Sequence, residues 1–239
     1  MLLVDLTLDS PEANLALDEA LLEQAEASGQ PRECLRLWEP AAPAVVIGRG
    51  SIAEQEANLE ACGERGVPIL RRTSGGAAIV AGPGCLMYAV VLSLELRPHL
   101  RSIDEAHRFV LGKLVEAIRP LAPAVEHCGT SDMAFGERKF SGNSLRVKRE
   151  HLLYHGTLLY DFPLELIAAC LATPPRQPDY RGGRSHLDFI TNLPVDVATL
   201  RRALIAAWSA DEPLFDWPRE LTEQLVAEKY AVREWNYRR

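Results

Sequence analysis

The chain has 239 residues, a length that fits one large domain or two small ones, and we expect a single domain over residues 1–239. Hydrophobic residues make up 47% and charged residues 25% of it, which excludes a disordered, collagen-like or coiled-coil chain. The net charge of -7 argues against a non-specific nucleic-acid binder. The longest nearly uncharged apolar run, Cys85 to Leu94, is too short to cross a membrane. The N-terminus lacks a secretory pattern, so we expect a cytoplasmic protein with neither nucleic-acid nor membrane partners.

The five cysteines are an odd number at wide spacings, without a Cys-x-x-Cys pair or a regularly spaced series of Cys and His residues. Neither a disulfide framework nor a structural zinc site fits that pattern. The cysteines are therefore expected to be free thiols, and no protein motif predicts a bound metal. They are Cys34, Cys62, Cys85, Cys128 and Cys170.

The first half of the chain predicts two helices and several short strands. Ser10 and Pro11 mark the start of a helix that ends near Ser28, because Ser is a favoured N-cap and Pro a favoured first helical residue. After it we expect strands at 35–37 and 44–47, a helix at 52–62, a strand at 68–72, a small-residue turn at 73–77, extended backbone at 78–80, a second turn at 81–84 and a long buried strand at 86–94.

The second half opens with a capping box, Ser102 to Glu105, which predicts a helix through Val115 with an apolar face. Strands are then expected at 133–135, 139–141, 144–147 and 152–160, and helices at 164–171, 197–208 and 219–230. In the middle of the chain strands mostly follow strands through short turns. The predicted fold class is therefore α+β, with a largely antiparallel sheet flanked by helices.

The first candidate for chemistry is the segment Arg71 to Ala78, which carries two arginines and two glycines. Glycines let the backbone approach a ligand closely, and the amides of such a turn can point at an anion. Adjacent strand residues point to opposite faces, so one arginine enters the site, and we assign Arg72. A tight hairpin turn with two solvated arginines is the alternative.

Two further segments carry candidate groups. Gly136 to Ser144 contains Lys139, whose compact charge suits a phosphate or an acyl carbonyl, although surface lysines are common in hairpins. Arg138 to Arg149 is rich in Lys and Arg without an acid, which predicts a local anion site. His155, before Gly156 in an apolar strand, either faces a ligand or is a core histidine.

Taken together, these segments resemble the lipoate-protein ligase A family, within the wider biotin and lipoate protein ligase superfamily. The resemblance runs through most of the chain, over 14–19, 45–49, 71–78, 132–133, 138–143 and 155–159. It implies the catalytic fold of that superfamily, with an antiparallel sheet flanked by helices and an apolar tunnel for an acyl chain.

The resemblance also implies an activity. Lipoate would react with ATP, in the presence of Mg²⁺, to form lipoyl-AMP. The lipoyl group would then be transferred to a lysine of a lipoyl domain or of a glycine-cleavage H-type protein. By motif position Lys139 would be the catalytic lysine. The substrate and adenylate would be bound by Arg72, Ser74, Gly75, Gly76, Ala77, Asp132, Ser141, Gly142, Asn143, His155 and Gly156.

The chain departs from the family in two places. Many members continue the glycine turn with His-Asp-x-Gly-Asn, where this chain has Ala81 to Cys85. The chain also ends without room for the accessory C-terminal domain of many ligases, so we expect that it either needs a separate accessory subunit or does not use ATP.

These departures leave two alternatives to a ligase. One is an octanoyltransferase that takes octanoyl from acyl carrier protein through a cysteine thioester, with Cys128 or Cys85 as the nucleophile. The other is a non-catalytic module that binds lipoyl domains or acyl ligands. The stretch Tyr180 to Phe189 is rich in arginine. It either contacts phosphates or the acceptor protein, or it is a solvated loop.

Overall fold

The computed structural model describes residues 1–173 and 177–238. Within them, eight strands form one sheet in the order β11-β1-β2-β6-β10-β9-β8-β7. Only the pairs that β1 makes with β2 and with β11 are parallel there, so the prediction of a largely antiparallel α+β fold is confirmed. The strands are β1 (Leu2–Asp5), β2 (Cys34–Trp38), β6 (Cys85–Ser93), β7 (Val125–Cys128), β8 (Asp132–Phe135), β9 (Arg138–Val147), β10 (His151–Leu159) and β11 (Glu212–Pro213).

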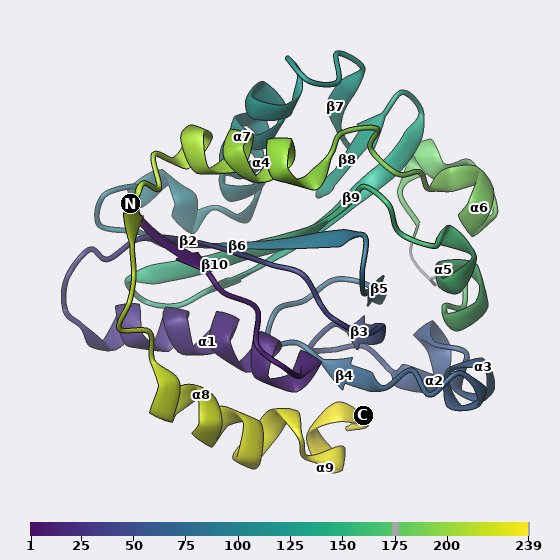
Figure 1. Ribbon diagram of the computed structural model, residues 1–239, viewed down its shortest axis with the longest axis horizontal. Coiled ribbons are helices and arrows are strands. Elements are labelled where there is room, and N and C mark those ends of the chain that lie inside the picture. Colours follow the sequence, from purple (N-terminus) through teal and green to yellow (C-terminus); the bar gives the residue numbers. More distant parts are fainter. Residues whose placement is uncertain (174–176, 239) are drawn as a thin grey trace.

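A second, three-stranded sheet lies beside the large one, next to the end of β6 in Figure 1. Its strands are β3 (Ala44–Ile47), β4 (Ile69–Arg71) and β5 (Ile79–Ala81), with β3 in the centre. Because β4 and β5 both border β3, the glycine-rich segment between them runs along one edge of this small sheet. That segment is therefore held at both ends by a sheet.

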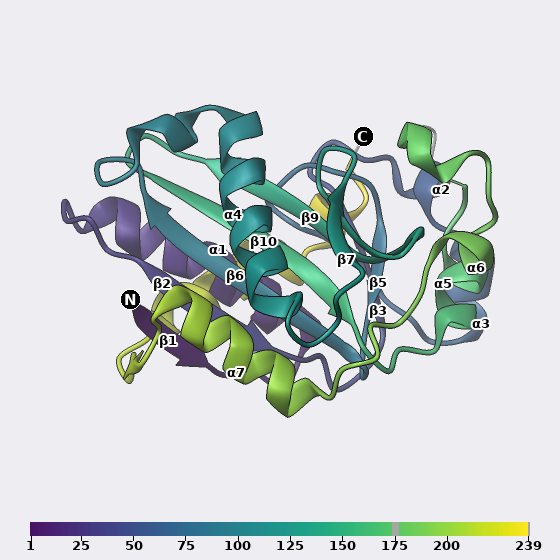
Figure 2. The ribbon, with the colours of Figure 1, turned by 90° about the horizontal axis from the view of Figure 1, so that it is seen from above.

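Helices cover both faces of the large sheet (Figures 1 and 2). On one face lie α4 (Ile103–Ile118) and α7 (Val197–Trp208), and on the other lie α1 (Pro11–Ala27) and α8 (Arg219–Leu225). The chain then passes through a π-helical turn, Val226–Tyr230, and ends in α9 (Arg233–Asn236), which contacts β4. Short helices α2 (Ala53–Glu56), α3 (Leu59–Glu64), α5 (Leu164–Cys170) and α6 (His186–Phe189) gather at one end.

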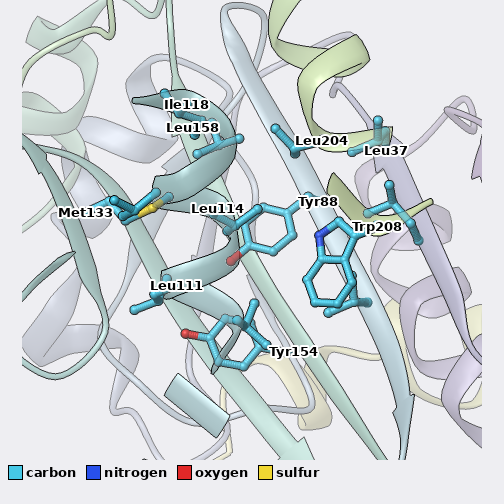
Figure 3. Packing of buried hydrophobic residues seen from close by; sticks show 14 of the residues in the cluster. Leu37, Tyr88, Leu111, Leu114, Ile118, Met133, Tyr154, Leu158, Leu204 and Trp208 are labelled. Atoms are coloured by element: carbon cyan, nitrogen blue, oxygen red, sulfur yellow. The ribbon is translucent and has the colours of Figure 1, made fainter. Parts of the chain in front are cut away.

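Successive side chains along each strand point to opposite faces of the sheet. In β2, Leu35 and Leu37 join the apolar cluster under α4 and α7, whereas Arg36 between them points to the α1 face. Figure 3 shows that cluster, in which Leu114 of α4 and Trp208 of α7 meet Tyr88 of β6. This core is the rigid support on which the opposite face is built.

Two predicted elements differ from the structure. The helix expected at 52–62 is divided into α2 and α3, because Ala57 forms a bridge with Leu171 and the Asn58 N–H donates to the Cys170 carbonyl. The Asn58 side chain then caps α3 by accepting from the Ala61 N–H. The two strands expected at 139–141 and 144–147 are one strand, β9.

The helix expected after Ser102 is confirmed, but the capping box is wrong. A 3-10 turn, Pro98–Arg101, comes directly before it, and the Ser102 N–H donates to the His99 carbonyl. The amide that Glu105 would have reached is therefore occupied, and Glu105 pairs with Arg108 instead. Sequence analysis also missed β1, β7, β11, α6 and α9, all of them short. Among the described residues, none of the helices has the length and apolar character needed to cross a membrane.

Candidate functional site

A cavity of about 440 Å³ lies between the glycine-rich segment, β9, β10 and the segment around α6. Its size is within the range of small-molecule sites. We call it the main cavity. One part of its wall is apolar and comes from α1, both sheets, α5 and α6. The residues of that part are Leu15, Val46, Ile79, Val80, Met87, Phe140, Leu159, Ile167, Leu171, Phe189 and Ile190.

The wall of the main cavity also holds an ion pair. The Lys139 Nζ lies 2.7 Å from Oδ1 of Asp132, and the Tyr180 hydroxyl donates to Oδ2 of Asp132 at 2.8 Å. Asp132 is almost buried, while the Lys139 side chain keeps 27% of its surface exposed. Burial raises the pKa of the Tyr180 phenol, and the neighbouring Asp132 carboxylate adds to that effect, so the phenol stays a donor. The cavity thus offers a charged amine, held in place but reachable from solvent.

A β-bulge places this lysine. Successive residues of β8, Met133 and Ala134, pair with Ser141 and Lys139, which leaves Phe140 as the extra residue on β9. Phe140 is fully buried in the apolar core. Gly142 completes the arrangement, because a Cβ there would lie 3.0 Å from the Lys139 Nζ. The lysine amine therefore rests against backbone that has no side chain.

Arg72 holds the glycine-rich segment in its shape. Its guanidinium donates to the carbonyls of Val46, Gly75 and Ala77 at 2.5 to 3.0 Å, and its Nε also donates to the Ser74 hydroxyl at 3.1 Å. Burial lowers its pKa to about 10, so it remains charged at neutral pH. Arg72 therefore contributes positive charge to the wall of the main cavity, while its N–H groups donate to the protein's own carbonyls and hydroxyl.

The glycines of this segment are required by close contacts. Gly76 has φ +85°, a region that suits glycine. A Cβ on Gly48 would lie 2.0 Å from the Gly76 carbonyl oxygen. The segments 45–49 and 71–78, both part of the family resemblance, therefore touch through backbone.

His155 connects the main cavity to α1. Its Nε2 lies 2.5 Å from the Ser74 hydroxyl, and its Nδ1 lies 3.5 Å from Oδ2 of Asp18. Asp18 is paired at 2.5 Å with Arg36, which is completely buried. The histidine is thus a buried, hydrogen-bonded side chain that also lines the cavity, and its contact with a ligand stays a prediction.

Asn143 is fixed by three neighbours. Its amide nitrogen donates to the Ser131 carbonyl at 2.8 Å and to the Ser141 hydroxyl at 3.0 Å, and its carbonyl oxygen accepts from the Tyr88 hydroxyl at 2.5 Å. A Cβ on Gly156 would lie 1.9 Å from that oxygen. The pairing of β9 with β10 at this point therefore demands glycine.

Comparison with known proteins supports a family for this arrangement. The lipoyl protein ligase A/B catalytic domain matches residues 10–208, which contain the whole of the main cavity. The chain belongs to this family. The octanoyltransferase LipM of Kyrpidia tusciae is 29% identical over 263 residues, which cover 95% of this chain and 94% of that protein.

Two solved structures share the fold. A bi-partite lipoate protein ligase of Thermoplasma acidophilum, studied with its E2 lipoyl domain, has a TM-score of 0.82 and 23% identity, over 99% of this chain and 95% of the other. A lipoate-protein ligase A bound with ATP has a TM-score of 0.80 and 23% identity, over 99% and 98%. The chain spans 42% of the length of a Schizosaccharomyces pombe relative, to which it is 30% identical over 167 residues.

Most of the residues that the family resemblance singled out meet in the main cavity. Its wall contains Arg72, Gly76, Ala77, Asp132, Lys139, Ser141, Gly142, Asn143, His155 and Gly156. Ser74 and Gly75 are placed elsewhere, on the wall of a neighbouring cavity behind the glycine-rich segment. The lysine and the glycine turn thus converge in the main cavity through Gly76 and Ala77.

The unassigned stretch 180–189 also reaches the main cavity. Arg181, His186 and Phe189 line it, and the Phe189 ring lies 5.0 Å from the Arg181 guanidinium. Burial lowers the pKa of His186, which favours the neutral imidazole. The basic composition of this stretch was a usable indication, but nothing local shows that it folds back over β9.

The two candidate nucleophiles lie outside the main cavity. Cys85 is completely buried, and desolvation raises the pKa of its thiol to about 12. The pKa of Cys128 is raised to about 11 by burial and by the neighbouring carboxylate of Glu126. Both shifts oppose thiolate formation, whereas a nucleophilic cysteine needs a lowered pKa. The five cysteines are free thiols, as expected.

Proposed function

We propose that the chain is a lipoate-protein ligase, which activates lipoate with ATP to lipoyl-AMP and transfers the lipoyl group to a lysine of a lipoyl domain. The observation that carries this proposal is the partly exposed Lys139 amine, paired with Asp132, in a cavity whose wall combines apolar and polar side chains. An acyl chain with a carboxylate at one end has the same combination of apolar and charged parts.

In the first step a carboxylate oxygen of lipoate attacks the α-phosphorus of ATP. The bond from that phosphorus to the bridging oxygen breaks, and pyrophosphate leaves with its electron pair. The Lys139 ammonium lines the cavity, and its proposed role is to stabilise the negative charge that grows on the α-phosphate and on the acyl oxygens. A cation that is already held in place stabilises such charge without having to reorganise at the moment of reaction.

In the second step the amine of the acceptor lysine attacks the acyl carbon, and AMP leaves with the electrons of the acyl–oxygen bond. The attacking nitrogen loses a proton to water or to a basic group. Lys139 again faces the oxygen that carries the developing charge. The apolar side chains of the cavity wall, among them Leu15 and Ile190, hold the hydrocarbon part in place through both steps. This keeps the reacting atoms close together and correctly oriented.

The cofactors and partners follow from the relatives. A ligase with ATP bound and a bi-partite ligase with an E2 lipoyl domain share this fold, and they support ATP, a lipoyl-domain acceptor and a separate accessory subunit. An H-type acceptor and Mg²⁺ remain predictions. Within residues 1–173 and 177–238, no three His, Cys, Asp or Glu side chains gather as metal ligands, so the proposal assigns no protein ligand to Mg²⁺.

The test is a mass-spectrometric assay of purified protein with lipoate, ATP, Mg²⁺ and an apo lipoyl domain, with and without an accessory subunit. A lipoyl mass gain on the acceptor and release of pyrophosphate are expected. Lys139→Ala should lower the rate about 10²–10³-fold, the range for losing one charge-stabilising donor. The matched control is Lys113→Ala on α4, which lies under Trp208 and should leave the rate unchanged. Normal turnover by Lys139→Ala would contradict the proposed role.

Octanoyl transfer is the second candidate, because the LipM relative aligns over nearly the full length of both chains. It predicts an octanoyl adduct on a cysteine after exposure to octanoyl-acyl carrier protein. Cys85→Ser and Cys128→Ser separate the two activities. An adduct that one of these variants abolishes would replace the ligase proposal, whereas ATP-dependent transfer in both variants supports it.

A further inference from the structure

A second cavity, of about 590 Å³, lies behind the glycine-rich segment and shares a wall with the main cavity. Gly76 and Ser144 face the main cavity, whereas their neighbours Gly75 and Leu145 face this one. We call it the arginine cavity, because Arg49, Arg71, Arg146 and Arg238 line it. Its wall, within the described residues, contains no Asp or Glu.

Arg71 builds this cavity. Its guanidinium is buried and donates to six backbone carbonyls, at Gly48, Arg49, Ser51, Trp235, Asn236 and Arg238, over 2.7 to 3.1 Å. It therefore has no donor left for a ligand. Its contribution is its charge and the way it ties the 48–51 loop to the C-terminal segment, so that two further arginines are held next to each other.

Those two arginines, Arg49 and Arg238, have donors to spare. The Arg49 side chain is exposed, and its guanidinium makes no hydrogen bond or ion pair with any residue in 1–173 or 177–238. Arg238 donates once, to the Arg49 carbonyl at 3.1 Å, and stacks 3.8 Å above the Trp235 ring. Burial lowers the pKa of Arg238, and the nearby Arg49 adds to that shift. The Arg49 and Arg238 guanidiniums are thus held close together, and neither forms an ion pair with a described residue.

Arg146 closes the cavity on the side of β9. Its NH1 is bound to Glu19 at 2.9 Å and to Thr73, which fixes the side chain in place. A guanidinium offers five donors in a planar fork, and such forks match phosphate oxygens in pairs. A small anion with several negative charges fits a hollow of this kind better than a single carboxylate.

We infer that the arginine cavity is a binding site for inorganic pyrophosphate. Four guanidiniums line a hollow without an acid, and the glycine-rich wall separates it from the cavity where the proposed adenylation releases pyrophosphate. This choice of ligand rests on the proposed function. The site would hold pyrophosphate at a place distinct from the Lys139–Asp132 pair.

The experiment is isothermal titration calorimetry with sodium pyrophosphate, on the full chain and without ATP, lipoate or acceptor. Wild type should bind one pyrophosphate. The double variant Arg49→Gln, Arg238→Gln should bind it at least about tenfold more weakly, because two charge-assisted contacts are lost. The matched control is Arg32→Gln, Arg202→Gln, which removes the same charge from exposed sites and should bind as wild type does.

Other outcomes have fixed meanings. Loss of pyrophosphate binding in Lys139→Ala, with binding intact in the double variant, would overturn the inference, because the main cavity would be the site. Unchanged pyrophosphate binding in the double variant, together with a raised KM for the lipoyl domain, would also overturn it and indicate a docking site for acidic side chains. If the double variant does not fold, the single variant Arg49→Gln replaces it in the titration, because the Arg49 guanidinium makes no hydrogen bond or ion pair with a described residue.

The titration tests the pyrophosphate site separately from the ligase reaction, so either one can be disproved while the other stands. Pyrophosphate binding that depends on Arg49 and Arg238, in a protein that makes no lipoyl-AMP, would leave the anion site standing and remove the proposed reaction. Ligase activity without pyrophosphate binding would do the reverse. ATP titrated in place of pyrophosphate distinguishes the free anion from the phosphate tail of a nucleotide, because ATP binding should depend on Lys139.

Discussion

The two faces of the large sheet are built on opposite principles. Under α4 and α7 the contacts are almost purely apolar, with Leu114, Tyr88 and Trp208 packed together (Figure 3). Under α1 the apolar contacts are interrupted by buried charge, with Asp18 and Glu19 side by side on the helix, each bound to a cation from elsewhere in the chain.

This difference teaches which face supports the fold and which positions the site. Apolar contacts are non-directional and tolerate small shifts, so they stabilise without specifying where one atom lies. Ion pairs and hydrogen bonds are directional, and on the α1 face they end at His155, Thr73 and Arg146, which border the two cavities. Substitutions on the two faces should therefore have different consequences.

The largest effect is expected from Arg36→Met, which leaves the Asp18 carboxylate buried and unpaired. Breaking a buried pair by removing one partner costs about 3–5 kcal/mol. The double variant Arg36→Met, Asp18→Leu should recover part of that free energy, because no lone charge remains. Chemical denaturation of the three proteins measures this, and a double variant no more stable than the single one would show that the two residues are not coupled.

On the other face, Leu114→Ala should cost about 2–5 kcal/mol, the range for removing a buried Leu side chain. Because Leu114 lies away from both cavities, the folded fraction should keep its activity. Urea unfolding gives the stability, and the acyl-transfer rate at a temperature well below the unfolding midpoint gives the activity. A rate that fell with the stability would break the division between the two faces.

Glu19→Gln tests the charge on the α1 face through pH. Burial pushes the pKa of the Glu19 carboxyl up, but Lys229, Tyr230 and Arg146 outweigh this, and its folded pKa lies below the ordinary value of 4.5. Such a group stabilises in full above its unfolded pKa, and this stabilisation is lost as pH falls through the folded pKa. Wild type should exceed the variant by about 1.5–3 kcal/mol at pH 7.

That gap should shrink as the pH is lowered below 4.5. Unfolding free energies of both proteins, measured from pH 7 downward, follow it. A difference that stays constant over this range would mean that Gln makes the same contacts without the charge.

The smallest effects concern two serines before helices. The Ser10 hydroxyl accepts from the Ala13 N–H, so Ser10→Ala should cost about 1 kcal/mol. Ser102 makes no such bond with its side chain, so Ser102→Ala should change stability by less than about 0.5 kcal/mol. Thermal unfolding of the pair compares them, and equal losses would restore the capping box.

The parts of the molecule that sequence analysis predicted are those that local pattern determines. The start of α1 follows from its cap, α4 from its apolar face, and β6 from a continuous apolar run. The division between α2 and α3 was not predictable, because the Asn58 amide is claimed by Cys170, a residue far along the chain.

The candidate site shows the same limit. The family resemblance located Lys139, Asp132 and the glycine turn, and they line one cavity. It put Ser74 and Gly75 in that cavity too, but both line the neighbouring cavity, and the Ser74 hydroxyl reaches the main cavity through its contact with His155. The arginine cavity depends on Arg71 reaching the C-terminal segment, and no local spacing relates the two.

The contact between Arg71 and the C-terminal segment has an optical consequence. The indole N–H of Trp235 donates to the Arg71 carbonyl, and the ring lies 3.8 Å from the Arg238 guanidinium and 4.2 Å from the Lys229 amine. The emission of this indole responds to nearby charge, so the protein carries its own fluorescent reporter beside the second hollow. An anion entering there would shift the emission wavelength without any attached dye.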